Sequence, residues 1–264
     1  MSELRILACE KRVPAPGAQI TLTADARAID ARNLSFTTSP HEECAVEEGL
    51  RLVEAHGGEL TVLTVGPPEA EEQLRFAVSV GAQHAVLVTA GDAAEDPDPQ
   101  ATARAITEAV RVLEAEGGLF DLLLFGNESA DAGGFQVGIR VARGLDRAIV
   151  NGIKAVEIST GETGDGVLTA RRESDAGFDV YRLELPAVLG VKEGINLPRY
   201  PTLPGRLRSK KAELETLTAT AAPGGLAMQR FETPAVEVSE TVVLGNGAVA
   251  AGAVVDLLVE LGLA

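Results

Sequence analysis

Aromatic residues and cysteines are scarce in this chain. It has no tryptophan and only two cysteines, and aromatic residues make up 3% of its 264 residues. Cys9 and Cys44 stand alone in the sequence, so they match neither the spacing of a metal site nor a disulfide framework. This usage is typical of a reducing compartment, and we expect a cytoplasmic protein without a bound metal.

Long apolar runs and an excess of positive charge are also missing. No apolar run approaches the roughly 20 residues of a membrane span, and charged residues interrupt the N-terminal stretch where a signal peptide would be apolar. The formal net charge is −16. Because this charge repels nucleic acids and anionic membranes, we expect no nucleic-acid partner and no membrane insertion.

Familiar catalytic motifs are absent from the sequence. It contains no H-E-x-x-H motif, no C-x-x-C pair and no G-x-S-x-G elbow. The three histidines, His41, His56 and His84, are scattered, and no two carboxylates stand out as an acid–base couple. The segment after the first expected strand lacks the serine- and glycine-rich loop of an ATP pyrophosphatase. We therefore expect a protein without catalytic residues of its own.

Short aliphatic runs alternate with amphipathic stretches along the first half of the chain. Hydrophobic residues make up 45% of the sequence, enough for a large core. Strands are expected at 4–9, 60–65, 85–88 and 122–125, and each is followed by apolar residues at helical spacing. This order predicts a doubly wound parallel sheet. Residues 156–184 instead predict antiparallel strands joined by glycine turns.

The first long helix has a strong start signal. Ser39 is expected as its N-cap, Pro40 occupies the first helical position, and Glu42 is placed to close a capping box with Ser39. Gly57 and Gly58 are expected to end the helix.

The stretch from residue 121 to residue 144 has the layout of an anion site. An apolar strand ends at Gly126, a polar loop follows, and an amphipathic helix begins near Val137. Gly133 and Gly134 would let phosphate oxygens approach the backbone, and the start of the helix would add free N–H groups. The alternative is that these glycines only shape a strand-to-helix turn, because neither a Walker motif nor a dinucleotide motif is present.

The last third of the chain lacks this alternation. A proline-rich loop at 192–204 is expected to be exposed, and a basic cluster follows at 206–211 in an otherwise acidic protein. Residues 214–240 are expected to form an extended arm, and residues 249–263 an amphipathic helix. Because such a helix has to pack somewhere, it either folds back on its own domain or binds a partner subunit.

Four stretches together resemble the beta subunit of electron transfer flavoprotein. Residues 11–14 match the family's K-R-V-P loop, and residues 39–48 are similar to its N-P-x-x-x-x-A-V-E-E helix start. Residues 172–177 resemble its R-E-x-D-G-G signature, and residues 195–204 are similar to L-N-E-P-R-Y-A-T-L-P. They occur in the family's order, and the resemblance covers nearly the whole chain.

The resemblance implies an electron carrier subunit and not an enzyme. The expected fold is a doubly wound parallel sheet like that of adenine nucleotide alpha hydrolases, with a small antiparallel portion. A nucleotide-binding domain at 1–208 would be followed by a C-terminal arm at 209–264 that docks on an alpha subunit. That subunit would hold most of the FAD, and the beta subunit would bind AMP structurally. Electrons would pass from acyl-CoA dehydrogenase-type donors to a quinone-linked or other redox acceptor.

The resemblance also assigns residues to two sites. The nucleotide pocket would include Cys9, Ser39, Pro40, His41, Glu42, Val65, Gly126, Asn127, Glu128, Ser129, Ala130, Asp131, Ala132, Gly133, Gly134, Phe135, Gln136 and Val137. The loop that docks redox partners would include Ile195, Asn196, Leu197, Arg199 and Tyr200. In that loop, Ile195 is expected to be the anchor.

Departures from the family pattern leave alternatives open. Ser39 stands in place of an asparagine, and His41 occupies a position that is often aromatic and near the flavin. In some relatives a second FAD replaces AMP and supports electron bifurcation; residues 101–103 and 136–138 faintly resemble that group, but its D-G-D-T segment is missing. A stand-alone adenine-nucleotide-binding module is a further alternative. An adenine-nucleotide hydrolase would share the fold but should show a catalytic loop.

Overall fold

The chain divides into two compact units. The computed structural model describes residues 3–89, 98–160, 166–220, 225–226, 228–235 and 241–263. The first unit spans Met1–Arg230 and the second Phe231–Ala264.

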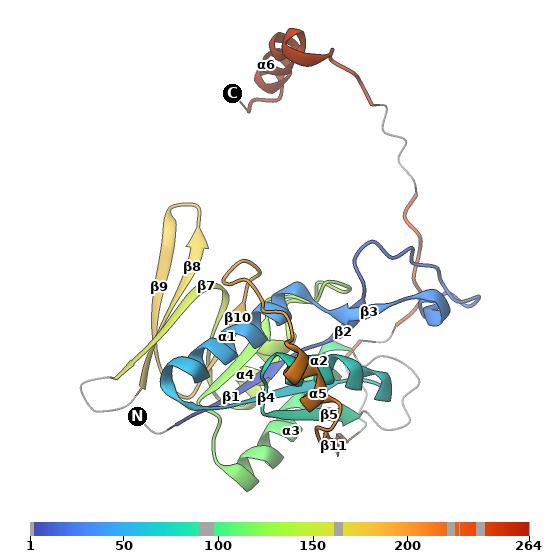
Figure 1. Ribbon diagram of the computed structural model, residues 1–264. Coiled ribbons are helices and arrows are strands. Elements are labelled where there is room, and N and C mark those ends of the chain that lie inside the picture. The colour runs from blue at the N-terminus through green and yellow to red at the C-terminus, as the bar shows by residue number, and fades with distance from the viewer. Residues whose placement is uncertain are drawn as a thin grey trace. The chain divides into compact units, whose positions relative to one another are not determined.

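A nine-stranded sheet lies at the centre of the first unit (Figure 1). Its strands follow the order β11-β5-β4-β1-β6-β10-β7-β8-β9. Neighbouring strands from β11 to β7 run parallel, whereas β8 is antiparallel to both β7 and β9. The strands are β1 (Leu4–Cys9), β4 (Gly58–Val65), β5 (His84–Thr89), β6 (Leu122–Gly126), β7 (Ala148–Thr160), β8 (Gly166–Ser174), β9 (Gly177–Glu184), β10 (Ala187–Val191) and β11 (Glu215–Thr218).

Helices pack on both faces of this sheet. The helices of the first unit are α1 (Pro40–His56), α2 (Glu71–Val80), α3 (Pro99–Gly117), α4 (Val137–Gly144) and α5 (Leu203–Ser209), with the short 3-10 turns η1 (Ala31–Asn33) and η2 (Pro68–Ala70). Side chains of α1 and α2 share one buried cluster with one face of the central strands. Side chains of α3 and α4 share a second cluster with the opposite face. The expected doubly wound α/β fold is confirmed.

The strand order reverses between β1 and β6. From β1 the chain moves to β4 and β5 on one side, and it then crosses to β6 on the other side of β1. Cys9, the last residue of β1, lies opposite Leu63 of β4 and Phe125 of β6. In open parallel sheets, ligands bind beyond the carboxyl ends of the strands at such a reversal. The topology therefore predicts a ligand site at the loops that follow β1, β4 and β6.

Several local features differ from the sequence-based expectation. A separate two-stranded antiparallel sheet, β2 (Arg12–Pro14) with β3 (Phe36–Thr38), was not anticipated. Residues 19–23 alternate in the sequence, a pattern that favours a short edge strand, but they contribute only an isolated bridge between Leu22 and Ile29. Strand β11 forms inside the stretch expected to be an arm, because it pairs in parallel with the exposed edge of β5.

The described part of the second unit contains one regular helix. The 3-10 turn η3 (Gly247–Ala250) leads into α6 (Ala251–Glu260). Within the described residues, α6 buries none of its side chains, and Val255 and Val259 are both more than half exposed. No described helix combines the length and apolar character that crossing a membrane requires.

Candidate functional site

The ends of three neighbouring strands bring predicted site residues together. Cys9 ends β1, Val65 ends β4 and Gly126 ends β6, and these strands lie side by side with β1 in the middle. Parallel strands place their carboxyl ends at one edge of the sheet, so the loops that follow them share that edge. The structure thus unites residues that are more than 50 positions apart in the sequence.

The first turn of α1 packs against the end of β6. A side chain at Gly126 would place its Cβ 2.5 Å from Cγ of Glu42 and 3.2 Å from Cβ of His41. Only glycine leaves room for this approach. The segment that follows Gly126 therefore starts in direct contact with the N-terminus of α1.

The predicted capping box at α1 is wrong. Ser39 is the N-cap, but its side chain makes no capping bond to the helix. Its buried hydroxyl instead donates to the backbone oxygen of Glu128 at 3.4 Å, and Glu42 Oε2 accepts the backbone N–H of Lys11 at 2.6 Å. Buried polar groups need hydrogen-bond partners. Ser39 therefore bonds to the loop after β6 and Glu42 to the loop after β1, and neither side chain caps the helix.

Residues 127–136, the glycine loop, connect β6 to α4 through unusual backbone conformations. Gly133 and Phe135 both have positive φ, 55° and 47°. The left-handed conformation costs a non-glycine residue such as Phe135 roughly 1–2 kcal/mol. Such strain persists where the surroundings impose it, often at ligand sites.

This conformation leaves backbone donors free at the start of α4. Gln136, its N-cap, makes no side-chain capping bond. None of the backbone N–H groups of residues 134–139 donates a hydrogen bond to any described residue. By contrast, the Asp98 carboxylate caps α3 by accepting the N–H of Ala101 at 2.7 Å. An uncapped helix N-terminus beside a glycine loop suits an anion.

The acidic residues of the glycine loop face basic groups. Lys11 Nζ lies 2.6 Å from Asp131 Oδ2. Burial alone would raise the pKa of Asp131, but the hydrogen bond and charge of Lys11 hold it below its usual value. Glu128 Oε1 lies 3.4 Å from Nε2 of His41. Lys11 was noted in the sequence only as part of a motif, and its contact with Asp131 gives it a place at this site.

Cys9 is not set up as a nucleophile. Its side chain is buried, and burial, with the nearby carboxyl groups of Glu42 and Glu10, raises the pKa of its thiol well above the usual value. A protonated thiol is neither nucleophile nor metal ligand. Among the described residues, no group of three or more His, Cys, Asp or Glu side chains is arranged to hold a metal ion.

Residues 192–200, the tethered loop, are fastened along α1. The N–H of Glu193 donates to Nδ1 of His41 at 2.9 Å. The side-chain amide of Asn196 donates to the Cys44 carbonyl at 3.0 Å and to Glu48 Oε2 at 2.8 Å. Arg199 forms ion pairs with two further carboxylates of α1, those of Glu47 and Glu54.

The tethers divide the predicted docking residues into two groups. Asn196 and Arg199 point to α1 and hold the loop. Leu197 is 90% exposed and Tyr200 is 89% exposed, so their side chains point to solvent. Ile195, the expected anchor, is partly buried and packs against the core cluster beneath α1. Sequence reasoning did not identify Glu47 and Glu54 as tethers, although Glu47 lies in a stretch that carries the family resemblance.

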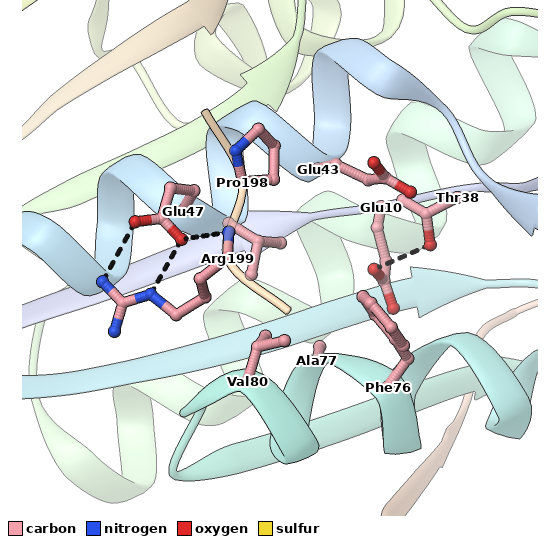
Figure 2. A pocket seen from close by; sticks show the side chains of 10 residues that line it. Glu10, Thr38, Glu43, Glu47, Phe76, Ala77, Val80, Pro198 and Arg199 are labelled. Carbon is pink, nitrogen blue, oxygen red and sulfur yellow. Dashed lines mark hydrogen bonds and ion pairs between the residues drawn. The ribbon is translucent and has the colours of Figure 1, made fainter. Parts of the chain in front are cut away.

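A small pocket lies between α1, α2 and the tethered loop (Figure 2). Figure 2 shows the guanidinium of Arg199 reaching Glu47 at one end and Glu10 bonded to Thr38 at the other. The cavity volume is about 20 Å³, which is room for about one water molecule. This pocket is too small for a nucleotide. None of residues 127–136 lines it, so it is separate from the glycine loop.

Comparison with known proteins identifies the family of the chain. The family described as Electron transfer flavoprotein domain matches residues 28–222, a span that contains α1, the glycine loop and the tethered loop. The chain is 35% identical over 179 residues to Electron transfer flavoprotein subunit beta of Bacillus subtilis (strain 168), which covers 68% of this chain and 66% of that relative.

Two further relatives are covered over more of their length. Electron transfer flavoprotein subunit beta of Syntrophomonas wolfei subsp. wolfei is 34% identical over 232 residues, 88% of this chain and 86% of the relative. Protein FixA of Sinorhizobium fredii is 32% identical over 219 residues, 83% of this chain and 75% of the relative. The chain therefore belongs to the electron transfer flavoprotein family, in which it groups with the beta subunits.

Proposed function

We propose that this chain is the beta subunit of a heterodimeric electron transfer flavoprotein and binds AMP at the glycine loop. An alpha subunit would hold most of the FAD, and the heterodimer would carry electrons from dehydrogenases of the acyl-CoA type to a quinone-linked or other redox acceptor. The observation that carries the nucleotide assignment is the row of N–H groups at residues 134–139, where the glycine loop meets α4, that donate no hydrogen bond to any described residue.

The glycine loop has the chemistry and the space for a phosphate group. An ideal Cβ at Gly133 would meet only Glu128 Oε2, at 3.8 Å, and one at Gly134 would meet only Pro99, at 3.9 Å. A phosphate could therefore approach the backbone here and accept hydrogen bonds from the start of α4. The nucleotide would sit beyond Cys9, Val65 and Gly126, where the strand order reverses.

The tethered loop supports the docking part of the proposal. Its contacts with α1 fix the backbone before binding, so little conformational entropy is lost when a partner binds. Leu197 and Tyr200 supply exposed apolar surface, and Arg206, Lys210 and Lys211 supply exposed positive charge close by in the sequence. Apolar contacts of this kind give affinity, and the basic group would steer an acidic partner.

The second unit supports the subunit part of the proposal. Helix α6 exposes most of its apolar side chains within the described residues, and an isolated helix of this length gains little stability from its own hydrogen bonds. We infer that the arm of residues 209–264 docks on the alpha subunit through its second-unit part, residues 231–264, because residues 215–218 already pair with β5 as strand β11. Removing residues 231–264 should leave the first unit folded and weaken association with the alpha subunit. A heterodimer of unchanged strength in gel filtration would contradict the arm.

Purification of the complex tests the proposal as a whole. The chain, co-expressed with the alpha subunit encoded in the same organism, should yield a heterodimer with one FAD and one AMP after acid release and chromatography. Two FAD and no AMP would instead support the bifurcating alternative. A stable monomer that binds nucleotide but no flavin would support a stand-alone module and overturn the electron-carrier assignment.

A further inference from the structure

His41 lies between the glycine loop and the tethered loop and uses both of its ring nitrogens. On one side, Nδ1 accepts the backbone N–H of Glu193 at 2.9 Å. On the other side, Nε2 lies 3.4 Å from Oε1 of Glu128. The two residues that it joins are 65 positions apart, and among the described residues no other side chain has a hydrogen bond or ion pair to both loops.

The donor and acceptor roles on the ring follow from this geometry. A backbone N–H can only donate, so Nδ1 of His41 must be the acceptor and carry no proton. The ring proton then sits on Nε2, the nitrogen that lies 3.4 Å from Oε1 of Glu128. The side chain of His41 is 14% exposed, so these two neighbours largely decide its orientation.

Glu128 extends the connection to the proposed phosphate position. Its second oxygen, Oε2, lies 3.8 Å from the place where a Cβ on Gly133 would sit. One carboxylate therefore borders the open space above Gly133 and also faces His41. A continuous path leads from that space through Glu128 and the imidazole of His41 to the N–H of Glu193.

We propose that His41 is a positioning residue that couples occupancy of the glycine loop to the order of the tethered loop. This proposal rests on the nucleotide site of the proposed function. A phosphate above Gly133 adds negative charge beside Glu128, which favours contact of Glu128 with the Nε2 proton. Polarisation of the imidazole by the Glu128 carboxylate, which lies 3.4 Å from Nε2 as an ion-pair partner, then makes Nδ1 a better acceptor for the N–H of Glu193. Nucleotide binding thereby stabilises the loop that presents Leu197 and Tyr200.

A second route between the loops has to be separated from this one. The N–H of Asn127 donates to the carbonyl of Val191 at 2.8 Å, so the backbone after β6 also touches the end of β10. The Ser39 hydroxyl donates to the backbone oxygen of Glu128, but among the described residues it makes no hydrogen bond to the tethered loop. Coupling through β10 would survive a change at residue 41, whereas coupling through the imidazole would not.

The variant His41→Asn is designed to remove the contact with Glu128 and to keep the hydrogen bond from the N–H of Glu193. The amide oxygen of asparagine can take the place of Nδ1 and accept the N–H of Glu193, but the shorter side chain does not reach Glu128. His56→Asn is the matched control, because His56 is the exposed last residue of the same helix. Glu128→Gln removes the carboxylate charge from the other side and gives a second test if the first variant folds poorly.

Hydrogen exchange resolved to residues 192–196 provides the readout, with AMP as the probe. The full chain with its co-expressed alpha subunit is stripped of nucleotide on charcoal and measured with and without AMP. In the wild type and in His56→Asn, AMP should slow exchange at Glu193 about fivefold or more, the lower end of typical coupling. In His41→Asn, the Glu193 amide should stay protected without AMP, but the response to AMP should disappear.

The outcomes separate this proposal from the proposed function. AMP protection of residues 133–139 together with an unchanged Glu193 amide in the wild type would overturn the coupling and leave the nucleotide site standing. An equal AMP response in the wild type and in His41→Asn would assign the coupling to β10 and also overturn the role of His41. If AMP protects neither loop, the nucleotide site is wrong and the coupling fails with it.

Discussion

Arg199 holds Glu47 through two parallel hydrogen bonds, from Nε at 2.9 Å and from Nη2 at 3.0 Å. The backbone N–H of Arg199 adds a third bond to Glu47 Oε2 at 3.1 Å. Glu47 is buried, while Glu54, the other partner of Arg199, is exposed. Hydrogen bonding to Arg199 lowers the pKa of Glu54. The fork of the guanidinium thus fixes the tethered loop to one buried carboxylate and one exposed carboxylate of α1.

Arg199→Lys should loosen the tethered loop although the charge is kept. A lysine cannot reproduce the two-pronged contact with Glu47, and the buried carboxylate would lose hydrogen bonds worth about 1–3 kcal/mol. Urea unfolding should show this loss, and hydrogen exchange at residues 196–200 should accelerate. The control is Arg206→Lys, at an exposed arginine of α5. Equal stability and equal exchange in both variants would contradict the clamp.

Leu197→Ala should slow electron transfer from a dehydrogenase and leave the fold intact. Leu197 is almost fully exposed, so its loss should change stability by no more than about 0.5 kcal/mol. Burying a leucine against a partner is worth roughly 1.5–3 kcal/mol, or about tenfold or more in affinity. Stopped-flow reduction of the heterodimer by a dehydrogenase measures this effect.

Ile195→Ala provides the comparison within the same loop. Ile195 packs against the core, so its truncation should lower the melting temperature as well as any docking affinity. If Ile195 is the anchor, its variant will also be slow in electron transfer at matched folded concentration. If Leu197→Ala transfers electrons at the wild-type rate while Ile195→Ala is slow, Ile195 is the principal contact with the partner and Leu197 does not contribute to docking.

The sequence predicted those parts of the site whose signals are local. The glycine loop could be recognised because a strand, its glycines and the next helix are adjacent in the chain. The roles of Asn196 and Arg199 could not, because their partners on α1 lie roughly 150 positions away, as the 152-residue separation of Arg199 and Glu47 illustrates. Ser39 and Glu42 match a capping pattern, but loops from distant segments engage both side chains, so tertiary contacts override the local signal.

The fold shows the same division. The alternation of apolar runs and amphipathic helices was sufficient to predict the doubly wound sheet, because each element carries its own periodicity. Strand β11 has four residues, and only Leu217 among them packs against the core. Its sequence therefore lacks the apolar alternation from which a strand could be predicted. Its pairing depends on the free edge of β5. Strand β7 pairs in parallel with β10 at its start and antiparallel with β8 further along, which no single local pattern encodes.

Gly133→Val should abolish nucleotide binding at the glycine loop. Gly133 has φ of 55°, a conformation that a β-branched residue resists, and the new side chain would fill the space above the loop. Gly17→Val is the matched control, because Gly17 has φ of 79° with open space around its Cβ position and lies in the first unit outside the glycine loop. Chromatography of released nucleotide should find AMP with the control and not with Gly133→Val. A folded Gly133→Val protein with full AMP content would refute the assignment.

Glu10 should make stability depend on pH in the neutral range. Its side chain is buried next to the small pocket; Oε2 accepts a hydrogen bond from Thr38, while Oε1 has no hydrogen-bond partner among the described residues. Burial raises the pKa of this carboxyl to about 8, with a smaller contribution from Glu43 and an opposing one from the Thr38 bond. Between the usual glutamate value near 4.5 and about 8, the folded protein therefore keeps a proton that the unfolded chain has released.

The sign of the effect follows from this difference in bound protons. The stabilisation is complete below the pKa of the unfolded chain and is lost as the pH rises through about 8. The free energy of unfolding should therefore fall from pH 5 to pH 8, with a slope of up to about 1.4 kcal/mol per pH unit from this group.

Glu10→Gln, which is neutral at every pH, should flatten that slope and raise the melting temperature at pH 8. Glu72→Gln, at an exposed carboxylate of α2, should leave the slope unchanged. Because burial also raises the pKa of Glu42, some slope should persist in Glu10→Gln. Parallel stability curves for the wild type and Glu10→Gln would show that Glu10 is already ionised in the folded protein and that the pocket admits enough water to solvate it.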